Sequence, residues 1–420
     1  MDNRLQALSA LYAQPGQRDR IQLRMERAVE QRVPKGLQAP IIRMATAAIT
    51  WQSMQPSFRD RAPRRRNTFF GFIRRLMTLV GVTGAGVAVT AALPWYAAIA
   101  AAVPFILLQV GLLRHFAIGE GHMAAHGTAV TEKMIPAFLW RGRSDRVEQA
   151  NAFVGRWATA AGLLTPHEIY RAKHFQHHEL ESFSITTDPD VADLKDKVGL
   201  IPGAPAPRQE HSYWLHLTSH WVHVRWFIER LIQNVFKADR AHRTAAFTVL
   251  TVLGAVLAIS PLHTVMLMIV FPWVFGVQIA AQLQLPSLHV WMTSHEHMKD
   301  VEDSATRMQG RFPLTPPPES RFSIGNSEWH KWLAEVVFFD LPMRLAVLNT
   351  QLANHDAHHL GWYQDMKDEE WDDLPAIREI MKRELGDRYG IAQRELWGAR
   401  TIVKAGLTAM ALSVTDDSES

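Results

Sequence analysis

The stretch that decides the fold runs from Leu76 to Leu113 and reads LMTLVGVTGAGVAVTAALPWYAAIAAAVPFILLQVGLL. It contains no charged residue, and it is about twice the roughly 20 residues that an α-helix needs to cross the hydrocarbon core of a bilayer. Leu93-Pro94-Trp95-Tyr96 lies at its middle, where proline favours a turn and the aromatic rings suit a membrane interface. The stretch therefore predicts a membrane hairpin with helices over 76–93 and 96–113.

A second uncharged block runs from Thr244 to Leu285 and is interrupted by Ser260-Pro261. It predicts a second hairpin, with helices over 244–260 and 262–284. A buried helical pair in a soluble protein is the alternative for either block, but two blocks of this length in one chain favour the membrane. We therefore predict an all-α membrane protein with four transmembrane helices and a helical cytoplasmic cap.

Basic residues gather outside both blocks, in the segments 59–75, 114–146 and 240–243, whereas the connections inside the hairpins contain no Lys or Arg. By the positive-inside bias, both termini and the middle segment are expected in the cytoplasm, as for an integral protein of a bacterial inner membrane. The arginine run at 59–66 is interpreted as an anchor on anionic lipid and not as a nucleic-acid site. The predicted segments are an N-terminal cytoplasmic region 1–75, hairpin 76–113, cap 114–243, hairpin 244–285 and C-terminal cap 286–420.

Cysteine is absent from the 420 residues, whereas histidine occurs 20 times. The chain therefore has no disulfide, no thiolate-bound zinc and no cysteine-ligated iron–sulfur cluster. Any bound metal must be held by histidine or carboxylate. The formal net charge is +4, which is modest for this length, so the placement of the charges is more informative than their sum.

Three histidine boxes lie in the predicted cytoplasmic segments. Side chains three or four residues apart project from one face of a helix, so each box can direct two or three imidazoles at one point. A mononuclear site needs three or four protein ligands, and eight candidate ligands therefore indicate a dinuclear site. The boxes are His122-Met-Ala-Ala-His126, His174-Phe-Gln-His177-His178 and His355-Asp-Ala-His358-His359.

The order of these boxes around two apolar blocks resembles the membrane fatty acid desaturase superfamily, which includes hydroxylases and ketolases. Gly119-Glu120-Gly121 before the first box resembles the family pattern, as does Asp188-Pro189-Asp190 after the second. Glu296-His297 resembles the Glu-His pair that supplies a further ligand in the family. The third box departs from it, because Leu-Gly-Trp362-Tyr363 follows where many members have a proline.

The resemblance implies two iron ions held by the eight box histidines, with O2 as co-substrate and no catalytic residue beyond the metal ligands. His297 is the implied ninth ligand, with His295 and His289 as rivals. Electrons would come from a ferredoxin, a rubredoxin or a cytochrome b5-like partner with its reductase, because the chain has no flavin, haem or iron–sulfur motif of its own. The implied activity is oxidoreductase: O2-dependent desaturation of a lipid-like acyl chain in a membrane lipid, on CoA or on acyl-carrier protein.

Other interpretations stay open. Hydroxylation or ketolation of a lipid or a specialised small molecule would use the same site, and a non-catalytic membrane metal-binding protein is a minor alternative. A histidine zinc hydrolase is disfavoured because no H-E-x-x-H motif occurs. His216, His220 and His223 also have helical spacing and are interpreted mainly as an interfacial group. Asp188 and Asp190 can orient ligand imidazoles or cap a turn.

Overall fold

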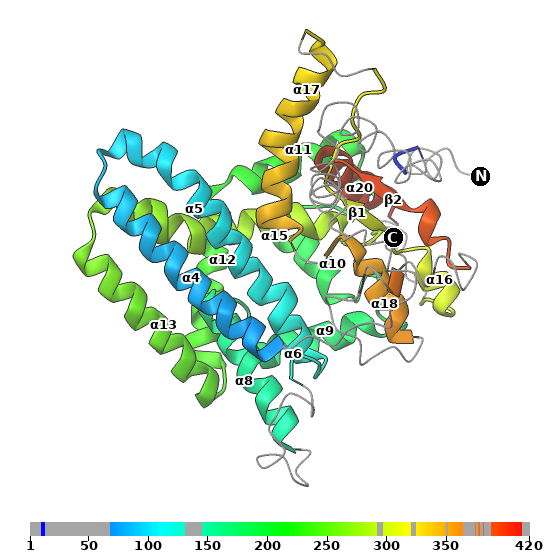
Figure 1. Ribbon diagram of the computed structural model, residues 1–420. Coiled ribbons are helices and arrows are strands. Elements are labelled where there is room, and N and C mark those ends of the chain that lie inside the picture. Colours follow the sequence, from blue (N-terminus) through cyan, green and yellow to red (C-terminus); the bar gives the residue numbers. More distant parts are fainter. Residues whose placement is uncertain are drawn as a thin grey trace, which may run out of the picture.

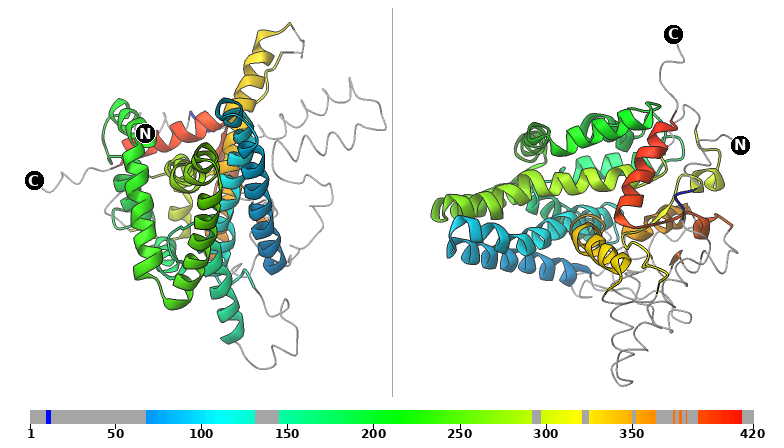
Figure 2. Two further views of the ribbon diagram at one scale, coloured as in Figure 1. Left: turned by 90° about the vertical axis from the view of Figure 1, so that its left-hand side faces the viewer. Right: turned by 90° about the horizontal axis from the view of Figure 1, so that it is seen from above.

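The computed structural model describes residues 10–12, 68–130, 145–291, 297–320, 325–349, 352–363, 374, 377–378, 381 and 388–413. Within these ranges nearly all regular structure is helical, and two short strands form the one sheet. The long helices α4, α5 and α13 lie together on one side of the molecule, and the shorter helices and the strands lie on the other (Figure 1). The view from above shows the same division (Figure 2).

The label η marks π-helical and 3₁₀ segments. The first part contains α4 (Thr68–Ala91), α5 (Trp95–His115), η2 (Phe116–Glu120), α6 (Gly121–Ala125), α8 (Asp145–Ala161), α9 (His167–His178), α10 (Pro189–Asp193), η4 (Leu194–Val198), α11 (Ala206–Thr218), α12 (His220–Ile232) and η5 (Gln233–Lys237). The next elements are α13 (Arg240–Ile259), α14 (Leu262–Val265), η6 (Met266–Gly276), α15 (Val277–Gln284), η7 (Leu285–Ser287), α16 (Val301–Ala305), β1 (Gly310–Phe312) and α17 (Ser327–Glu335). The last are η8 (Val336–Asp340), η9 (Met343–Val347), η10 (Leu352–Asn354), α18 (His355–Tyr363), η12 (Ile391–Gln393), β2 (Glu395–Trp397) and α20 (Ala399–Ala411).

Four helical segments are long and apolar enough to cross a membrane: Phe70–Ala91, Trp95–Ala125, Arg240–Ile259 and Leu262–Ser287. The prediction of an all-α membrane protein with four such helices is confirmed. The second segment is longer than predicted, because the helix continues without a break from α5 through η2 and α6. Arg114 and His115 are tolerated inside this helix because both are buried against protein and do not face lipid.

Apolar side chains on these helices face outward. Val80, Val103 and Val252 are each half exposed or more, which would be unfavourable in water and suits contact with lipid. Trp95 and Tyr96, at the turn between the first two segments, are about two-thirds exposed at 64% and 66%. Aromatic residues at this place agree with an interfacial position for the turn.

The two turns between apolar helices lie at the same end of the molecule. The His263 ring donates through Nε2 to the carbonyl oxygen of Thr90 at 3.0 Å, which joins the start of α14 to the end of α4. Helix α4 also packs along α5. Because α6 follows the opposite end of α5, the first histidine box lies at the far end of these helices from the turns (Figure 1).

Small residues allow the closest helix contacts. Ala160 of α8 packs against Ala245 and Ala246 of α13, as is common where membrane helices approach closely. The Arg156 guanidinium of α8 also pairs with the Asp239 carboxylate, at 2.8 Å, at the N-cap of α13. On α5, Gly111 lies against the backbone of Leu345, where a Cβ atom would collide. These contacts fix α13 relative to α8, and α5 relative to η9.

Candidate metal centre

Each histidine box lies on a helix, as its spacing predicts. The first box lies on α6 and the residue that follows it. The second box lies at the C-terminal end of α9, and the third lies at the N-terminal end of α18. Helix α6 packs on α9, and the ring of His122 lies 4.4 Å from that of His358 on α18, centroid to centroid. The three boxes, which are far apart in the sequence, therefore meet at one place (Figure 1).

Five imidazoles form a first histidine group. It contains at least one residue of each box, and the potential ligand nitrogens all lie within 4.8 Å of one another. The Nε2 atom of His174 is 2.8 Å from Nε2 of His126 and 3.1 Å from Nε2 of His178. The members are His122, His126, His174, His178 and His358.

A second histidine group lies beside the first. His177, His289 and His359 present ligand nitrogens within 4.8 Å of one another, and the Nε2 atoms of His177 and His289 are 3.1 Å apart. His355 joins them, because its Nε2 is 3.0 Å from Nε2 of His359. We define the second histidine group as these four residues.

The two histidine groups are in contact with each other. The rings of His178 and His359 stack with centroids 4.2 Å apart, and His122 and His355 have centroids 6.2 Å apart. All eight box histidines are therefore brought together, in two adjoining groups instead of one. Nine converging imidazoles, with His289, exceed what one ion can bind, so the arrangement suits two neighbouring ions.

The expected ninth ligand is placed differently by the structure. His297 is exposed, and its Nδ1 donates to the backbone carbonyl of Glu181, so it is not part of either group. His289 is fully buried and is a member of the second histidine group. The third rival, His295, lies outside the described residues. His289 lies two residues after the 3₁₀ turn η7, at the end of the fourth apolar helix.

The histidines of α11 and α12 are separate from the centre. His216 donates through Nδ1 to the Ser212 carbonyl at 2.9 Å, and His223 donates through Nε2 to the Leu217 carbonyl at 2.9 Å. His220 is exposed. None of the three belongs to the groups of potential ligands found among the described residues.

The environment favours neutral imidazole, which is the form that binds a metal. Burial, followed by the positive charge of Arg171, lowers the pKa of His126 to about 3. Burial and then the neighbouring imidazoles lower the pKa of His174 and His359 well below the ordinary value. At neutral pH these rings therefore offer lone pairs without first losing a proton.

His177 is held by carboxylates. Its Nδ1 donates to Asp188 at 2.9 Å, and Asp190 lies 3.9 Å from its Nε2. Burial alone would lower the pKa of His177, but the two carboxylates and the hydrogen bond that the ring donates to Asp188 outweigh burial and raise the pKa to about 9. Carboxylates that favour a proton on this ring also favour a metal cation bound to its Nε2.

Asp188 both contacts an imidazole ring and caps a turn, which are the two roles considered for it from the sequence. One carboxylate oxygen accepts from the backbone N–H of Asp190 at 2.8 Å and caps α10. The other accepts from the backbone N–H of Ser184 at 2.7 Å. Because Asp188 is fixed from both sides, it can fix the orientation of the His177 ring.

Replacing Asp188 with Asn should weaken the second histidine group. The change removes the charge that orients His177 and makes its Nε2 more basic, so we expect a loss of about 10- to 100-fold in metal affinity. Metal content after dialysis against graded chelator measures this. Asp196→Asn, at an exposed position of the neighbouring segment η4, is the matched control and should behave as wild type. Equal metal retention in both variants would contradict the orienting role of Asp188.

The third box is anchored by a buried ion-pair network. Arg378 donates through Nε to Asp356, next to His355, at 2.9 Å, and through Nη1 to Glu395 of β2 at 2.6 Å. Burial alone would lower the pKa of Arg378, but the two carboxylates raise it above its usual value. The sequence pattern does not predict this ion pair, because Arg378 lies 22 positions after Asp356.

Replacing Arg378 with Met should destabilise the fold. Asp356 and Glu395 would be left buried without a counter-charge, and breaking such a network costs about 3–5 kcal/mol. The free energy of unfolding in detergent, with Tm as a second measure, tests this. Arg388→Met removes an exposed ion pair with Glu302 and should cost at most about 1 kcal/mol. Similar losses in the two variants would contradict the anchoring role.

A cavity of about 190 Å³ reaches both histidine groups. His122 and His174 of the first group border it, as do His177 and His355 of the second. The rest of the wall comes mainly from η2, α9, α10, α12 and α15, with Arg114 from the end of α5. We call this space the histidine cavity. A substrate held in it would lie directly against the potential metal ligands.

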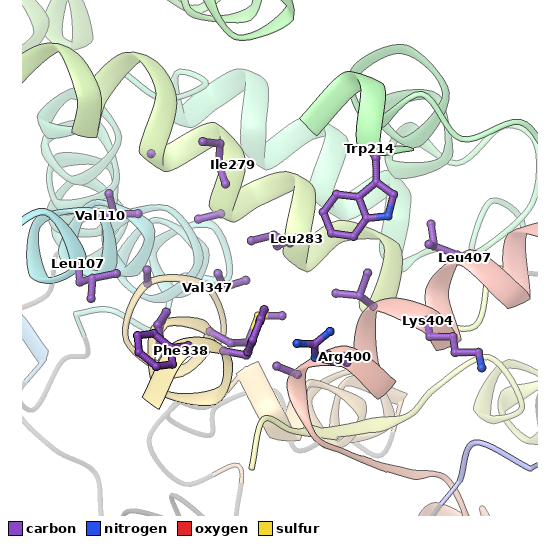
Figure 3. Close-up of a pocket in the computed structure, with 18 of the residues that line it drawn as sticks. Leu107, Val110, Trp214, Ile279, Leu283, Phe338, Val347, Arg400, Lys404 and Leu407 are labelled. Atoms are coloured by element: carbon purple, nitrogen blue, oxygen red, sulfur yellow. The ribbon is translucent and has the colours of Figure 1, made fainter. Parts of the chain in front are cut away.

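A larger cavity of about 700 Å³ lies on the other side of α15. Ile279 and Leu283 face this larger space, whereas Gln278 and Gln284 line the histidine cavity. Aliphatic and aromatic side chains surround it, with Arg400 and Lys404 on its α20 side (Figure 3). No histidine lines it among the described residues, so it is set apart from the candidate centre despite its size.

These features define an α-helical membrane protein with histidine groups that could hold metal ions. The sequence model of the family described as fatty acid desaturase matches residues 121–334, slightly more than half of the chain. The protein therefore belongs to the fatty acid desaturase family. The match covers the first and second boxes in full, and it ends before the third. No curated protein and no solved structure matches the chain at a significant level.

Proposed function

We propose that this protein is a di-iron oxidoreductase that uses O2 to insert a double bond into a lipid-like acyl chain. One observation carries the proposal: two adjoining histidine groups border a single cavity. Membership of the fatty acid desaturase family supports the reaction class. The acyl chain would be part of a membrane lipid or be carried on CoA or on acyl-carrier protein.

The residues present fit two iron ions. Imidazole nitrogen is a good ligand for iron, and the described part of the two groups offers nine such rings. We propose that one ion is held by His122, His126, His174, His178 and His358, and the other by His177, His289, His355 and His359. His289 takes the role first expected of His297. When bound, the two irons would supply the activation of O2 and the removal of hydrogen from an unactivated C–H bond.

The protein's own contribution is orientation and exclusion of water. Asp188 fixes the His177 ring, and Arg378 fixes the helix start that carries His355. The histidines are buried or nearly so, and a reacting C–H bond in the histidine cavity would be shielded from solvent. Shielding of this kind limits side reactions of a reactive centre.

Hydroxylation or ketolation is the second candidate, and the histidine cavity favours it. The cavity is small and carries polar side chains, among them Tyr170, Gln278 and Gln284. Such walls suit a compact polar molecule better than a long hydrocarbon chain. Desaturation and hydroxylation each use one O2, two electrons and two protons. Desaturation releases two waters, whereas hydroxylation places one oxygen in the product and releases one water.

Topology and partners complete the proposal. The two hairpins would span a bacterial inner membrane, with the segments 1–75, 114–243 and 286–420, and so both termini, in the cytoplasm, as the distribution of basic residues predicts. The electrons would come from a separate ferredoxin, rubredoxin or cytochrome b5-like protein with its reductase.

The test is turnover with a reconstituted electron supply. Full-length protein purified with iron is given NADPH, ferredoxin, ferredoxin reductase and candidate substrates, and O2 uptake and product mass are followed. Loss of two hydrogens supports desaturation, and gain of one oxygen supports the second candidate. If iron-loaded protein gives no O2-dependent change in acyl lipids, acyl thioesters or free acids, the proposed function is wrong.

A further inference from the structure

Two buried arginines line the histidine cavity. Arg114 of α5 and Arg230 of α12 are only 7% and 4% exposed. Arg114 donates to the side chain of Gln284, and Arg230 donates through Nη2 to the Trp273 carbonyl at 3.3 Å. Within the described part of the chain, neither guanidinium has a carboxylate partner, and the Nε of each is buried without a hydrogen-bond acceptor.

The two positive charges are close enough to affect each other. Burial, and after it the charge of Arg114, lowers the pKa of Arg230 to about 9. Both guanidinium groups nevertheless stay protonated at neutral pH. Buried charges are normally paired, because removing them from water without a counter-charge is unfavourable. A carbonyl and an amide do not supply that counter-charge.

The remaining charges of the cavity do not neutralise this pair. Asp193 is held by Lys197 at 2.7 Å, and Lys173 lies 4.0 Å from the same carboxylate. Asp190 stands 3.9 Å from His177. The cavity wall therefore has four basic side chains against two carboxylates, and both carboxylates already lie beside other side chains.

The larger cavity provides a contrast. Its cation Arg400 is paired with Glu335 at 2.7 Å and is 65% exposed, and its other cation, Lys404, is also exposed, so neither is a buried charge. Of these two cavities, only the histidine cavity is lined by buried arginines without a carboxylate partner in the described part of the chain.

We propose that the histidine cavity binds an anionic group, a carboxylate or a phosphate, between Arg114 and Arg230. The inference rests on the proposed function, because it takes the histidine end of the cavity as the reacting end. The substrate would carry its anionic group inside the cavity, near the C–H bond that reacts. Free acids or phosphate monoesters are then preferred to neutral esters, whose headgroups would leave both arginines unpaired.

The test compares charged and neutral ligands of equal chain length. Binding of octanoate, octyl phosphate and methyl octanoate to full-length, iron-loaded protein in non-ionic detergent is measured by calorimetry. At least one of the two anions should bind about 10- to 100-fold more tightly than the ester, as expected for a charge-assisted contact. The tighter anion identifies which headgroup the site prefers.

Variants of Arg230 locate the contact. Arg230→Gln should reduce anion binding about 10-fold or more, and Arg230→Lys should retain part of it. Arg225→Gln is the matched control, because Arg225 lies on the same helix and is exposed, and it should bind as wild type. Iron content should be the same in all four proteins.

Equal binding of both anions and the ester to wild-type protein, or unchanged anion binding by Arg230→Gln, would overturn the proposal. The wild-type comparison decides even if Arg230→Gln does not fold. Failure of the proposed function would look different. Anion binding would then persist and depend on Arg230, while iron-loaded protein with reductant and O2 would leave every ligand unchanged.

Discussion

Replacing His358 or His177 with alanine should abolish turnover. The two residues belong to different histidine groups, so each substitution damages one of the two proposed ion sites and leaves the other intact. Changes that only touch a metal ligand's hydrogen-bond partner cost about 10- to 100-fold, and loss of a ligand should cost more than about 100-fold. Because O2 activation by the pair needs both ions, the activity loss should be equally severe in the two variants.

Iron content separates this explanation from simple unfolding. Each variant should fall from about two irons per chain to about one, since the other group keeps its ligands. His211→Ala is the control, because His211 is exposed on α11 and belongs to neither histidine group. Wild-type turnover in either His358→Ala or His177→Ala would remove that residue from the ligand set.

His289→Ala and His297→Ala should differ sharply. His289 is buried with its Nε2 3.1 Å from that of His177, whereas His297 is exposed and bonded to a backbone carbonyl. We expect His289→Ala to lose more than about 100-fold in turnover together with iron from the second group. His297→Ala should keep its iron and nearly all of its turnover. Both proteins are assayed side by side for iron and for O2-dependent product.

The reverse result would restore the assignment based on family resemblance. If His297→Ala lost iron while His289→Ala kept it, the segment that carries His297 would have to close over the centre when metal binds. Equal losses in both would mean that the second group has more ligands than the structure brings together.

The membrane helices could be predicted from the sequence because their signal is local. An uncharged run such as 76–113 satisfies its own backbone hydrogen bonds as a helix, and no distant contact is needed to explain it. Their ends were less predictable. The second helix continues to Ala125, because Arg114 and His115 find buried protein surroundings that composition alone does not reveal.

The eight box histidines could be predicted for a similar reason. Spacing of three and four residues within a helix is a local property, and the structure keeps each box on one helix. The division into two groups could not be predicted, because it depends on how α6, α9 and α18 pack. His174 and His177, three residues apart on α9, belong to different groups.

Contacts between distant segments account for what was missed. Arg114 looked like a basic flank of the first apolar block, yet it is buried beside Arg230, a residue 116 positions later. Arg378 similarly holds the third box through Asp356. A single sequence has no periodicity that joins such pairs, so they emerge only from the packing.

The central claim is that this chain holds two coupled iron ions. The most direct measurement is iron per polypeptide in full-length protein purified anaerobically with iron supplied, with Mössbauer spectra to detect magnetic coupling. The proposal predicts close to two irons per chain in a nitrogen-rich, coupled site. Folded protein with all nine proposed ligand histidines intact but no iron above background, or with a single uncoupled ion, would contradict the proposal.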